Sequence, residues 1–199
     1  MMKKNACCFL HRAGPLAAVL AAALVLSGCF GAAFVGGAAT GVLIASDRRT
    51  PEVVLGDERV ELTAVQRLNQ RFGDQAHISV TSYNYTVLLT GEVPDAKMKE
   101  EAERIASQVE RVKAVVNELQ LGAPTPLSSR GNDTYLTGRI KASFVTANRF
   151  NANQVKVVTE RGVVYLMGLV NKKEADDATD IARRTPGVQK VVRVFEYPS

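Results

Sequence analysis

The chain has 199 residues and a formal net charge of +5, a length that accommodates one medium-sized domain or two small ones. Although 46% of its residues are hydrophobic, much of that apolar content lies within the first 45 residues. All three cysteines, Cys7, Cys8 and Cys29, lie there as well, so the remaining chain has no thiol for a disulfide, for redox chemistry or for a metal.

The N-terminal segment has the parts of a secretory signal. Lys3, Lys4 and Arg12 supply positive charge, and residues 16–26 form an uninterrupted apolar run of 11 residues. A run of that length is shorter than the roughly 20 residues that a membrane-spanning helix needs. It leads into residues 26–29, Leu-Ser-Gly-Cys, which provide the small residues that a signal peptidase requires before its cleavage site.

Residues 26–29 also resemble a bacterial lipobox, in which the cysteine becomes the first residue of the mature protein. We therefore expect residues 1–28 to be removed and Cys29 to carry covalent lipid, because several acyl chains together give a stable anchor. The alternative is an ordinary signal peptide or an uncleaved anchor in which Cys29 has no role. Phe30 stands where an aspartate would retain a lipoprotein in the inner membrane of enterobacteria, which favours the outer membrane, facing the periplasm.

Residues 29–57 are predicted to form the lipidated N-terminus and a flexible tether. The stretch 30–45 is too short and too rich in glycine for a transmembrane helix. Gly37 and Gly41 have the spacing of a helix-pairing motif in membranes, which is the alternative interpretation. Whether this stretch contacts the bilayer stays open at this point.

One strand-like stretch occurs twice in the rest of the chain. Residues 87–93 and 164–170 both carry Val, Leu, Gly and Val at alternate positions, which is the period of a strand with one buried face. The copies are separated by 77 residues, and each follows a β-branched run at the same offset. A period of that length is the size of a small domain, so the sequence predicts one domain written twice.

The first predicted domain, residues 58–121, has the order helix, strand, strand, helix, strand. Its first helix carries an apolar stripe at every fourth residue, Val60, Ala64, Leu68 and Phe72. Strands at about 77–82 and 86–93 are separated by a turn short enough for an antiparallel hairpin. A second helix and a strand at 112–121 complete the domain.

Residues 122–131 contain two prolines and two glycines and are predicted to be a linker. The second predicted domain, residues 132–199, repeats the order of the first. Residues 132–134, Asn-Asp-Thr, offer N-caps to a helix that runs to about Ala147, with Leu136, Ile140 and Phe144 buried. The remaining elements are expected at 154–159, 162–170, 172–184 and 188–197.

This order, α-β-β-α-β in each copy, predicts an α+β protein. Two helices on one face of a three-stranded sheet bury the apolar surface of such a unit most simply. The first two strands form an antiparallel hairpin, and the third follows a helix, so it is expected to join in parallel through a right-handed crossover. Gly91 and Gly168 lie inside strands, where glycine marks a bulge or a close approach of a helix.

The chain resembles the BON-domain family. The motifs that carry the resemblance are Asn132-Asp133-Thr134, Val155-Lys156-Val157, Val164 to Val170 with its Gly168, Ala182 and Gly187-Val188. In the first domain, Arg111-Val112 stands where the family has Gly-Val. The resemblance implies a non-catalytic protein whose second BON domain binds anionic phospholipid and which supports outer-membrane integrity. It also implies that lipid contacts the first helix of the second domain, at Asp133, Thr134, Tyr135, Arg139 and Lys141.

Helix geometry selects part of that set. At 100° per residue, Tyr135, Arg139, Ala142, Thr146 and Arg149 share one exposed side if the helix extends that far. A tyrosine at the interface with arginines that pair with phosphate suits a lipid headgroup layer. The alternative is an ordinary solvated helix face. Lys141 lies off this side, so its assignment rests on the resemblance alone.

Charge distinguishes the two domains. Residues 47–121 carry a net charge of −3, and residues 130–199 carry +5, which makes the second domain the better candidate to meet an anionic surface. The basic pairs Lys172-Lys173 and Arg183-Arg184 are interpreted as solvated helix ends, the second suited to the negative end of a helix dipole. No basic patch is interleaved with aromatic residues, which argues against a nucleic-acid partner.

No catalytic or metal site and no cofactor are predicted. His77 is the one histidine after the signal segment, and the sequence places neither a nucleophile nor further metal ligands beside it. It is interpreted as a surface or strand-edge residue. Glu100, Glu101 and Glu103 are interpreted as a polar helix face.

Two classes of function follow. The favoured one is a lipid-anchored outer-membrane protein whose second domain binds an anionic phospholipid membrane. The alternative is a periplasmic scaffold or chaperone whose sheet faces or acidic first domain contact envelope assembly machinery. Outer-membrane assembly or cell-division proteins are candidate protein partners, and the sequence leaves open which partners exist. The lipid preference, the oligomeric state and the packing between the domains stay open.

Overall fold

The computed structural model describes residues 47–123 and 126–198. The predicted signal peptide, Cys29 and the Gly/Ala-rich stretch after it lie outside the described residues. Within residues 47–123 and 126–198, no helix combines the length and the apolar character that crossing a bilayer requires. The described residues belong to one compact unit.

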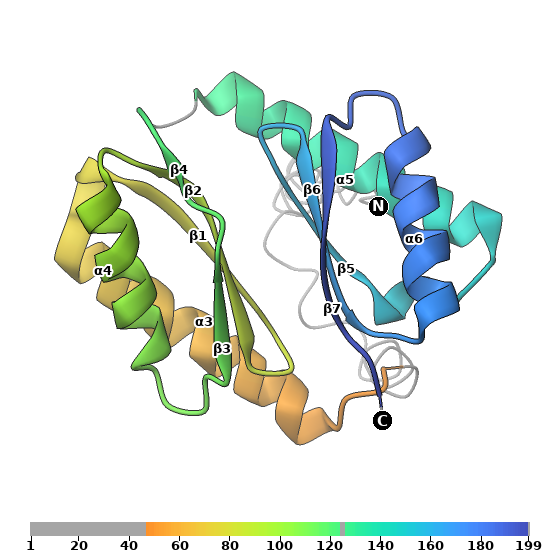
Figure 1. The fold of residues 1–199 in the computed structure, drawn as a ribbon, viewed down its shortest axis with the longest axis horizontal. Helices are drawn as coiled ribbons and strands as arrows, with labels where there is room; N and C mark the ends of the chain where they lie inside the picture. Colours follow the sequence, from red (N-terminus) through yellow and green to blue (C-terminus); the bar gives the residue numbers. More distant parts are fainter. Residues whose placement is uncertain (1–46, 124–125, 199) are drawn as a thin grey trace, which may run out of the picture. The chain divides into compact units, whose positions relative to one another are not determined.

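The order α-β-β-α-β is present twice, as predicted (Figure 1). The first repeat consists of α3 (Pro51–Phe72), a 3₁₀ turn (Gly73–Gln75), β1 (His77–Tyr83), β2 (Thr86–Val93), α4 (Ala96–Ser107), β3 (Ala114–Asn117) and β4 (Gln120–Leu121). The second repeat consists of α5 (Leu127–Ala147), a 3₁₀ turn (Ala152–Gln154), β5 (Lys156–Glu160), β6 (Val163–Leu169), α6 (Lys172–Arg184) and β7 (Lys190–Glu196).

Both first helices begin earlier than predicted. α3 starts at Pro51 rather than near residue 58, because the Thr50 side chain accepts a hydrogen bond from the Val53 amide and a proline suits the first helical position. α5 starts at Leu127, so the last residues of the predicted 122–131 linker are helical. The predicted N-caps at 132–134 therefore lie inside the helix and cannot cap it.

The strand pairing is mixed, as predicted. In the first sheet β1 pairs antiparallel with β2, and β3 and β4 both pair in parallel with β2. In the second sheet β5 pairs antiparallel with β6, and β7 in parallel with β6. The third strand of the first repeat, predicted as 112–121, is interrupted at Glu118 and Leu119, and the Leu119 side chain turns into the core instead.

Each hairpin turn consists of two residues with positive φ. These are Asn84 and Tyr85 in the first repeat (φ 51° and 65°) and Arg161 and Gly162 in the second (φ 52° and 74°). Two left-handed residues give the turn twist that matches the twist of the paired strands. Gly162 was expected at such a position, whereas a tyrosine with positive φ is unusual and indicates that neighbouring groups hold it there.

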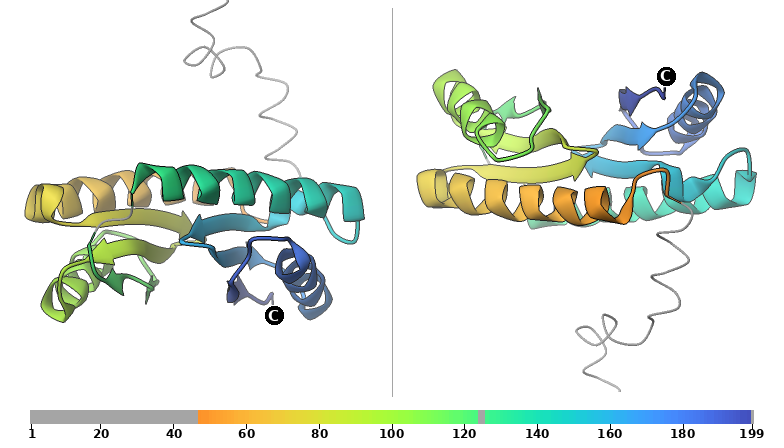
Figure 2. Two further views of the ribbon diagram at one scale, coloured as in Figure 1. Left: turned by 90° about the horizontal axis from the view of Figure 1, so that it is seen from above. Right: turned by 90° about the horizontal axis from the view of Figure 1, so that it is seen from below.

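Each repeat has its own core between the helices and one face of the sheet. Figure 1 shows α3 and α4 covering the same face of their sheet, and Figure 2 shows α3 running beside β1 and α5 beside β5. The predicted stripe of α3 and the predicted core residues Leu136, Ile140 and Phe144 of α5 are buried. Alternate residues of the repeated stretch, Val87 and Leu89 in one copy and Val164 and Leu166 in the other, complete the two cores.

The opposite faces of the sheets pack against each other. Tyr83 and Leu88 from the first repeat form a buried cluster with Tyr165 and Met167 from the second. Valines and a leucine around them are partly buried, namely Val116, Val158, Val163, Leu169, Val192 and Val194. The strands are therefore apolar on both faces, and the packing between repeats that the sequence left open is a shared hydrophobic layer.

Polar contacts surround this layer. The Glu196 carboxylate of β7 accepts hydrogen bonds from the side-chain amide of Asn84 (2.6 Å) and the hydroxyl of Thr86 (2.9 Å), both in the first repeat. The Lys156 ammonium lies 2.6 Å from the Glu61 carboxylate of α3. Arg48, which precedes α3, pairs with both carboxylate oxygens of Glu174 on α6, at 2.7 and 2.8 Å.

The two strand glycines lie where another backbone approaches. A Cβ on Gly91 would collide with the carbonyl oxygen of His77, and a Cβ on Gly168 would collide with that of Gln154. The predicted close approach is thus present, but the neighbouring strand or the turn before it makes it, rather than a helix.

Candidate functional site

Asp133 is buried in the second repeat, where it holds the hairpin turn. Its side chain is 4% exposed, and its carboxylate accepts hydrogen bonds from the amides of Arg161 (2.8 Å) and Gly162 (2.9 Å). Asp57 of α3 does the same for the first hairpin, accepting from the amides of Asn84 and Tyr85 at 2.8 Å each.

The two aspartates occupy equivalent places near the start of each first helix, which is a repeat signal that the sequence already carried. These hydrogen bonds satisfy turn amides that would otherwise be buried without partners. They also explain how Tyr85 keeps its positive φ. The structure therefore gives Asp133 a role in holding the fold, and it does not place that carboxylate with the exposed candidates for lipid contact.

Tyr135 and Arg139 do lie together on the exposed side of α5. The Tyr135 side chain is 64% exposed, and the guanidinium carbon of Arg139 lies 5.7 Å from the centre of its ring. Arg139 also approaches the carbonyl oxygen of Pro186, at 3.5 Å. An exposed ring beside a cation that remains partly open to solvent can contact both the apolar and the anionic parts of an interface.

Beside this pair, a groove of about 530 Å³ runs between α5 and α6. We call it the α5–α6 groove, and it is lined by Arg139, Ala142, Ser143, Thr146, Ala147, Arg149, Asp180, Ile181, Arg184, Thr185 and Pro186. Arg139, Ala142 and Thr146 share one side of α5 as predicted, whereas Arg149 lies beyond the end of the helix and reaches the groove from the segment that follows it. Three arginines line the groove against one carboxylate.

The arginines of the groove have acidic neighbours on α6. Arg149 follows the end of α5 and lies 3.5 Å from carboxylate oxygens of both Asp177 and Asp180. Arg184 lies 3.0 Å from Asp180. Because these ion pairs are partly exposed, each holds its arginine only weakly in place and leaves guanidinium donors for another anion.

Arg184 is a residue that the sequence interpretation assigned only to a helix end. The 172–184 helix and its basic C-terminus were predicted correctly, but which neighbouring helix Arg184 faces depends on how α6 packs on the sheet. No periodicity within α6 carries that information.

The remaining candidates lie elsewhere. The Thr134 hydroxyl donates to the carbonyl oxygen of Arg130 one turn earlier, on the exposed side of α5. Lys141 is exposed but lines a different groove, which it shares with Arg49, Glu61 and Lys156 between the repeats. The structure thus keeps Lys141 apart from the side that carries Tyr135, as helix geometry predicted.

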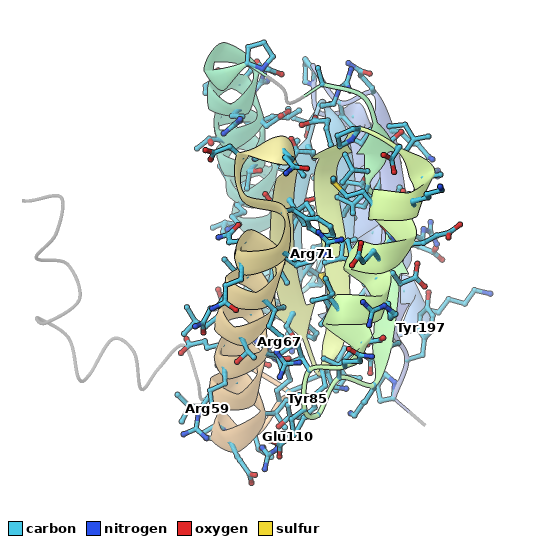
Figure 3. All side chains as sticks on the ribbon, turned by 90° about the vertical axis from the view of Figure 1, so that its left-hand side faces the viewer. Arg59, Arg67, Arg71, Tyr85, Glu110 and Tyr197 are labelled. Carbon is cyan, nitrogen blue, oxygen red and sulfur yellow. The ribbon has the colours of Figure 1, made fainter. Side chains whose placement is uncertain are left out.

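The equivalent helix of the first repeat also carries arginines, and its own repeat uses most of them. Figure 3 shows Arg59, Arg67 and Arg71 following one another along α3. Arg71 makes two hydrogen bonds to Glu101 of α4, at 2.8 and 3.0 Å, and Arg67 donates to the Gln108 carbonyl oxygen at 2.9 Å. Arg59 is exposed.

His77 has acidic neighbours that the sequence did not reveal. It is 21% exposed on β1, and its Nδ1 lies 3.2 Å from a carboxylate oxygen of Glu92, whose side chain is fully buried. Glu160 of the second repeat completes a group of three in which one potential ligand atom from each residue lies within 4.8 Å of the others. Burial raises the pKa of Glu160, His77 counteracts this, and Glu92 and Asp133 raise the pKa further.

Comparison with known proteins finds the BON domain twice in this chain, at residues 61–123 and 132–198. The chain is 36% identical to the outer membrane lipoprotein DolP of Haemophilus influenzae over 185 residues, which covers 92% of this chain and 95% of that protein. It is 32% identical to the 21 kDa hemolysin of Actinobacillus pleuropneumoniae, over 76% of this chain and 79% of the other. It is 35% identical to the osmotically-inducible protein Y of Escherichia coli, over 57% of this chain and 58% of that protein.

Proposed function

Because the chain belongs to the BON-domain family, we propose that it is a non-catalytic outer-membrane lipoprotein whose second repeat binds anionic phospholipid and so helps to maintain the outer membrane. The relative in Haemophilus influenzae, which matches nearly the whole chain, carries the name outer membrane lipoprotein. The lipobox-like residues 26–29 give this chain its own means of attachment at Cys29. The BON family is not known to be catalytic.

The observation that carries the lipid proposal is the exposed Tyr135 ring next to the α5–α6 groove. In a bilayer interface the ring enters the headgroup region, where an amphipathic aromatic side chain is stable. Arg139, Arg149 and Arg184 then reach phosphate oxygens, to which a guanidinium can donate two parallel hydrogen bonds. An anionic headgroup competes with the exposed carboxylates of α6 for these donors.

Local charge supports the same face. The second repeat has the positive net charge, whereas in the first repeat Arg71 of α3 is bound by Glu101 of α4 and Arg67 by the carbonyl oxygen of Gln108. A basic residue near an anionic membrane surface contributes about 1 kcal/mol of binding free energy, and salt screens this contribution. The second repeat therefore has both an aromatic contact and the electrostatic attraction.

The test uses residues 47–199, because the lipid anchor would attach the full chain to any vesicle. Co-sedimentation is measured with vesicles of phosphatidylcholine alone and with vesicles containing phosphatidylglycerol or cardiolipin. We expect binding only to the anionic vesicles, and weaker binding at high salt. Tyr135→Glu and Arg139→Glu should each weaken it about tenfold or more, since each adds negative charge at the interface.

The matched control is Arg59→Glu on α3. Residues 59 and 135 stand in equivalent places, two residues after the buried aspartates Asp57 and Asp133, and both are exposed. Arg59→Glu changes the net charge as much as Arg139→Glu does, so a general electrostatic effect would weaken binding equally in both. Equal losses, or unchanged sedimentation of the two α5 variants, would contradict a specific site on the second repeat.

The scaffold alternative has fewer surfaces to use than the sequence suggested. A partner that binds the sheets would need the faces that carry Leu88 and Tyr165, and these faces are buried against each other. An exposed surface of the acidic first repeat would remain for a protein partner. Absence of binding to anionic vesicles, together with specific crosslinks from the first repeat to envelope proteins, would favour that function instead.

A further inference from the structure

The layer between the repeats has two ends. At each end three residues come together, and the three at one end are the repeat equivalents of the three at the other. At one end Tyr83 meets Gln154, whose carbonyl oxygen lies 3.4 Å from the tyrosine hydroxyl, and Leu169 packs in the same cluster. At the other end the residues displaced by 77 positions meet, which are Glu160, His77 and Glu92. One end is thus built from neutral side chains and the other from an imidazole and two carboxylates.

Backbone pairing holds two of these three residues in place. His77 and Glu92 are directly opposite each other in the antiparallel pair of β1 and β2. Gly91, which precedes Glu92, has a φ of 113° and accommodates the His77 carbonyl oxygen at a place where a side chain would collide with it. Glu160, the last residue of β5, comes from the second repeat.

One of the separations matches that of a metal centre. Bonds of about 2.0–2.2 Å to nitrogen and oxygen place the ligand atoms of a tetrahedral Zn²⁺ site about 3.3 Å apart. His77 Nδ1 and Glu92 Oε2 are 3.2 Å apart, and the longest separation in the group is within 4.8 Å. The separation of His77 and Glu92 fits a zinc site, and binding of one ion requires the Glu160 carboxylate to move closer to them.

Charge balance points the same way. An imidazole and two carboxylates meet at a place where the Glu92 side chain has no exposure. Two carboxylates at this distance repel each other, and a divalent cation bound between them reduces that repulsion. Arg130 lies near enough to affect Glu160, and Asp133 adds to the negative field, although the two turn amides already engage that carboxylate.

We propose that His77, Glu92 and Glu160 bind Zn²⁺ and that the ion fastens the first repeat to the second. One imidazole nitrogen and two carboxylate oxygens are ligands that zinc accepts, and a water completes four-coordination through the partly exposed His77 side. The site does not depend on lipid binding, because none of its residues lines the α5–α6 groove.

The experiment uses the full chain in detergent with Cys7, Cys8 and Cys29 changed to serine and His11→Gln. These changes remove every thiol and leave His77 as the only histidine. Zinc chloride is titrated near neutral pH, and bound zinc is measured by equilibrium dialysis. The imidazole ¹⁵N signals of His77 are followed in parallel, and they report on this residue alone.

We expect one zinc per chain, a shift of the His77 ring signals, and a rise of several degrees in the midpoint of thermal unfolding at saturating zinc. His77→Gln and Glu160→Gln should each weaken binding at least ~100-fold, since loss of a direct ligand costs more than loss of an outer-shell partner. Glu103→Gln removes an exposed carboxylate on α4 and should leave zinc binding unchanged.

Four outcomes would overturn the proposal. The first three are no bound zinc at micromolar concentrations, ring signals of His77 that do not move, and undiminished binding by the Glu160→Gln chain, which would leave the second repeat without a part in the site. Displacement of the zinc by calcium at equal concentration would also overturn it, because calcium binds oxygen ligands and does not select an imidazole nitrogen.

Discussion

The two repeats share a fold, a core and even a device for holding the hairpin, yet they present different helices to their surroundings. Asp57 and Asp133 bind equivalent turn amides, and the repeated strands fill equivalent cores. On the first helices the likeness ends. Arg71 of α3 is bound by α4, whereas Tyr135 of α5 is exposed above a groove lined by arginines. The hairpin aspartates and the core positions are kept in both copies, and on the first helices the differences lie on the exposed sides.

The sheet faces that pack against each other are also alike in most places and different in one. Most of that layer is apolar in both repeats, because each sheet buries its second face against the other. The repeats differ at one end of this layer. Glu92 of the first repeat stands there at the position equivalent to Leu169 of the second repeat. This departure places a carboxylate of the first repeat beside His77 and Glu160, where the proposed zinc ion binds.

The hairpin aspartates allow the sharpest test of the comparison. Asp57→Ala should lower the free energy of unfolding by about 3–5 kcal/mol, because it also breaks the 2.7 Å pair with Arg49. Asp133→Ala should cost less, about 2–3 kcal/mol, since its carboxylate accepts hydrogen bonds from two neutral turn amides and no ion pair is broken within the described residues. Urea unfolding of residues 47–199 gives both values. A larger loss for Asp133→Ala would contradict the ranking.

Equivalent substitutions in the two cores should have similar effects, and each should destabilise both repeats. Leu89→Ala and Leu166→Ala remove fully buried side chains at equivalent positions, and each should cost about 2–5 kcal/mol. Because the repeats share the layer around Leu88 and Tyr165, either substitution should destabilise both repeats in a single transition. Hydrogen exchange of amides in β2 and β6 measures this. Faster exchange in the mutated repeat alone would show that the repeats unfold independently.

Arg48 connects the repeats at the surface and should have the smallest effect. Its hydrogen bond is the main cause of the lowered pKa of Glu174, while burial raises that pKa and the Asn171 amide lowers it. The pair stabilises the fold above the ordinary pKa of 4.5, and this contribution is lost as the pH falls through the lowered value.

Arg48→Ala should therefore cost at most about 1 kcal/mol near pH 7, since the pair is partly exposed, and should cost almost nothing in strong acid. Unfolding measured at both pH values gives the difference. An equal cost in acid would mean that Arg48 acts through packing or through its hydrogen bond to the Leu169 carbonyl oxygen rather than through Glu174.

Local pattern was enough to predict the element order, the mixed sheets and the buried faces of the helices. The alternation of Val, Leu, Gly and Val and the four-residue spacing of Val60 to Phe72 are properties of single elements, and burial selects them directly. Helix starts were less accurate. Thr50 and Pro126 begin the first helices several residues earlier than the predicted boundaries, because the cap residue of a long helix depends on which turns pack against the sheet.

Only the tertiary structure shows which residues from different elements lie together. Tyr135 and Arg139 could be paired from helix periodicity, but Arg184 joins them only because α6 packs beside α5. His77 had no visible partners in the sequence, since Glu92 reaches it through strand register and Glu160 through the packing of one repeat on the other. Sequence spacing determines faces within an element, whereas contacts between elements follow from how buried surfaces fit together.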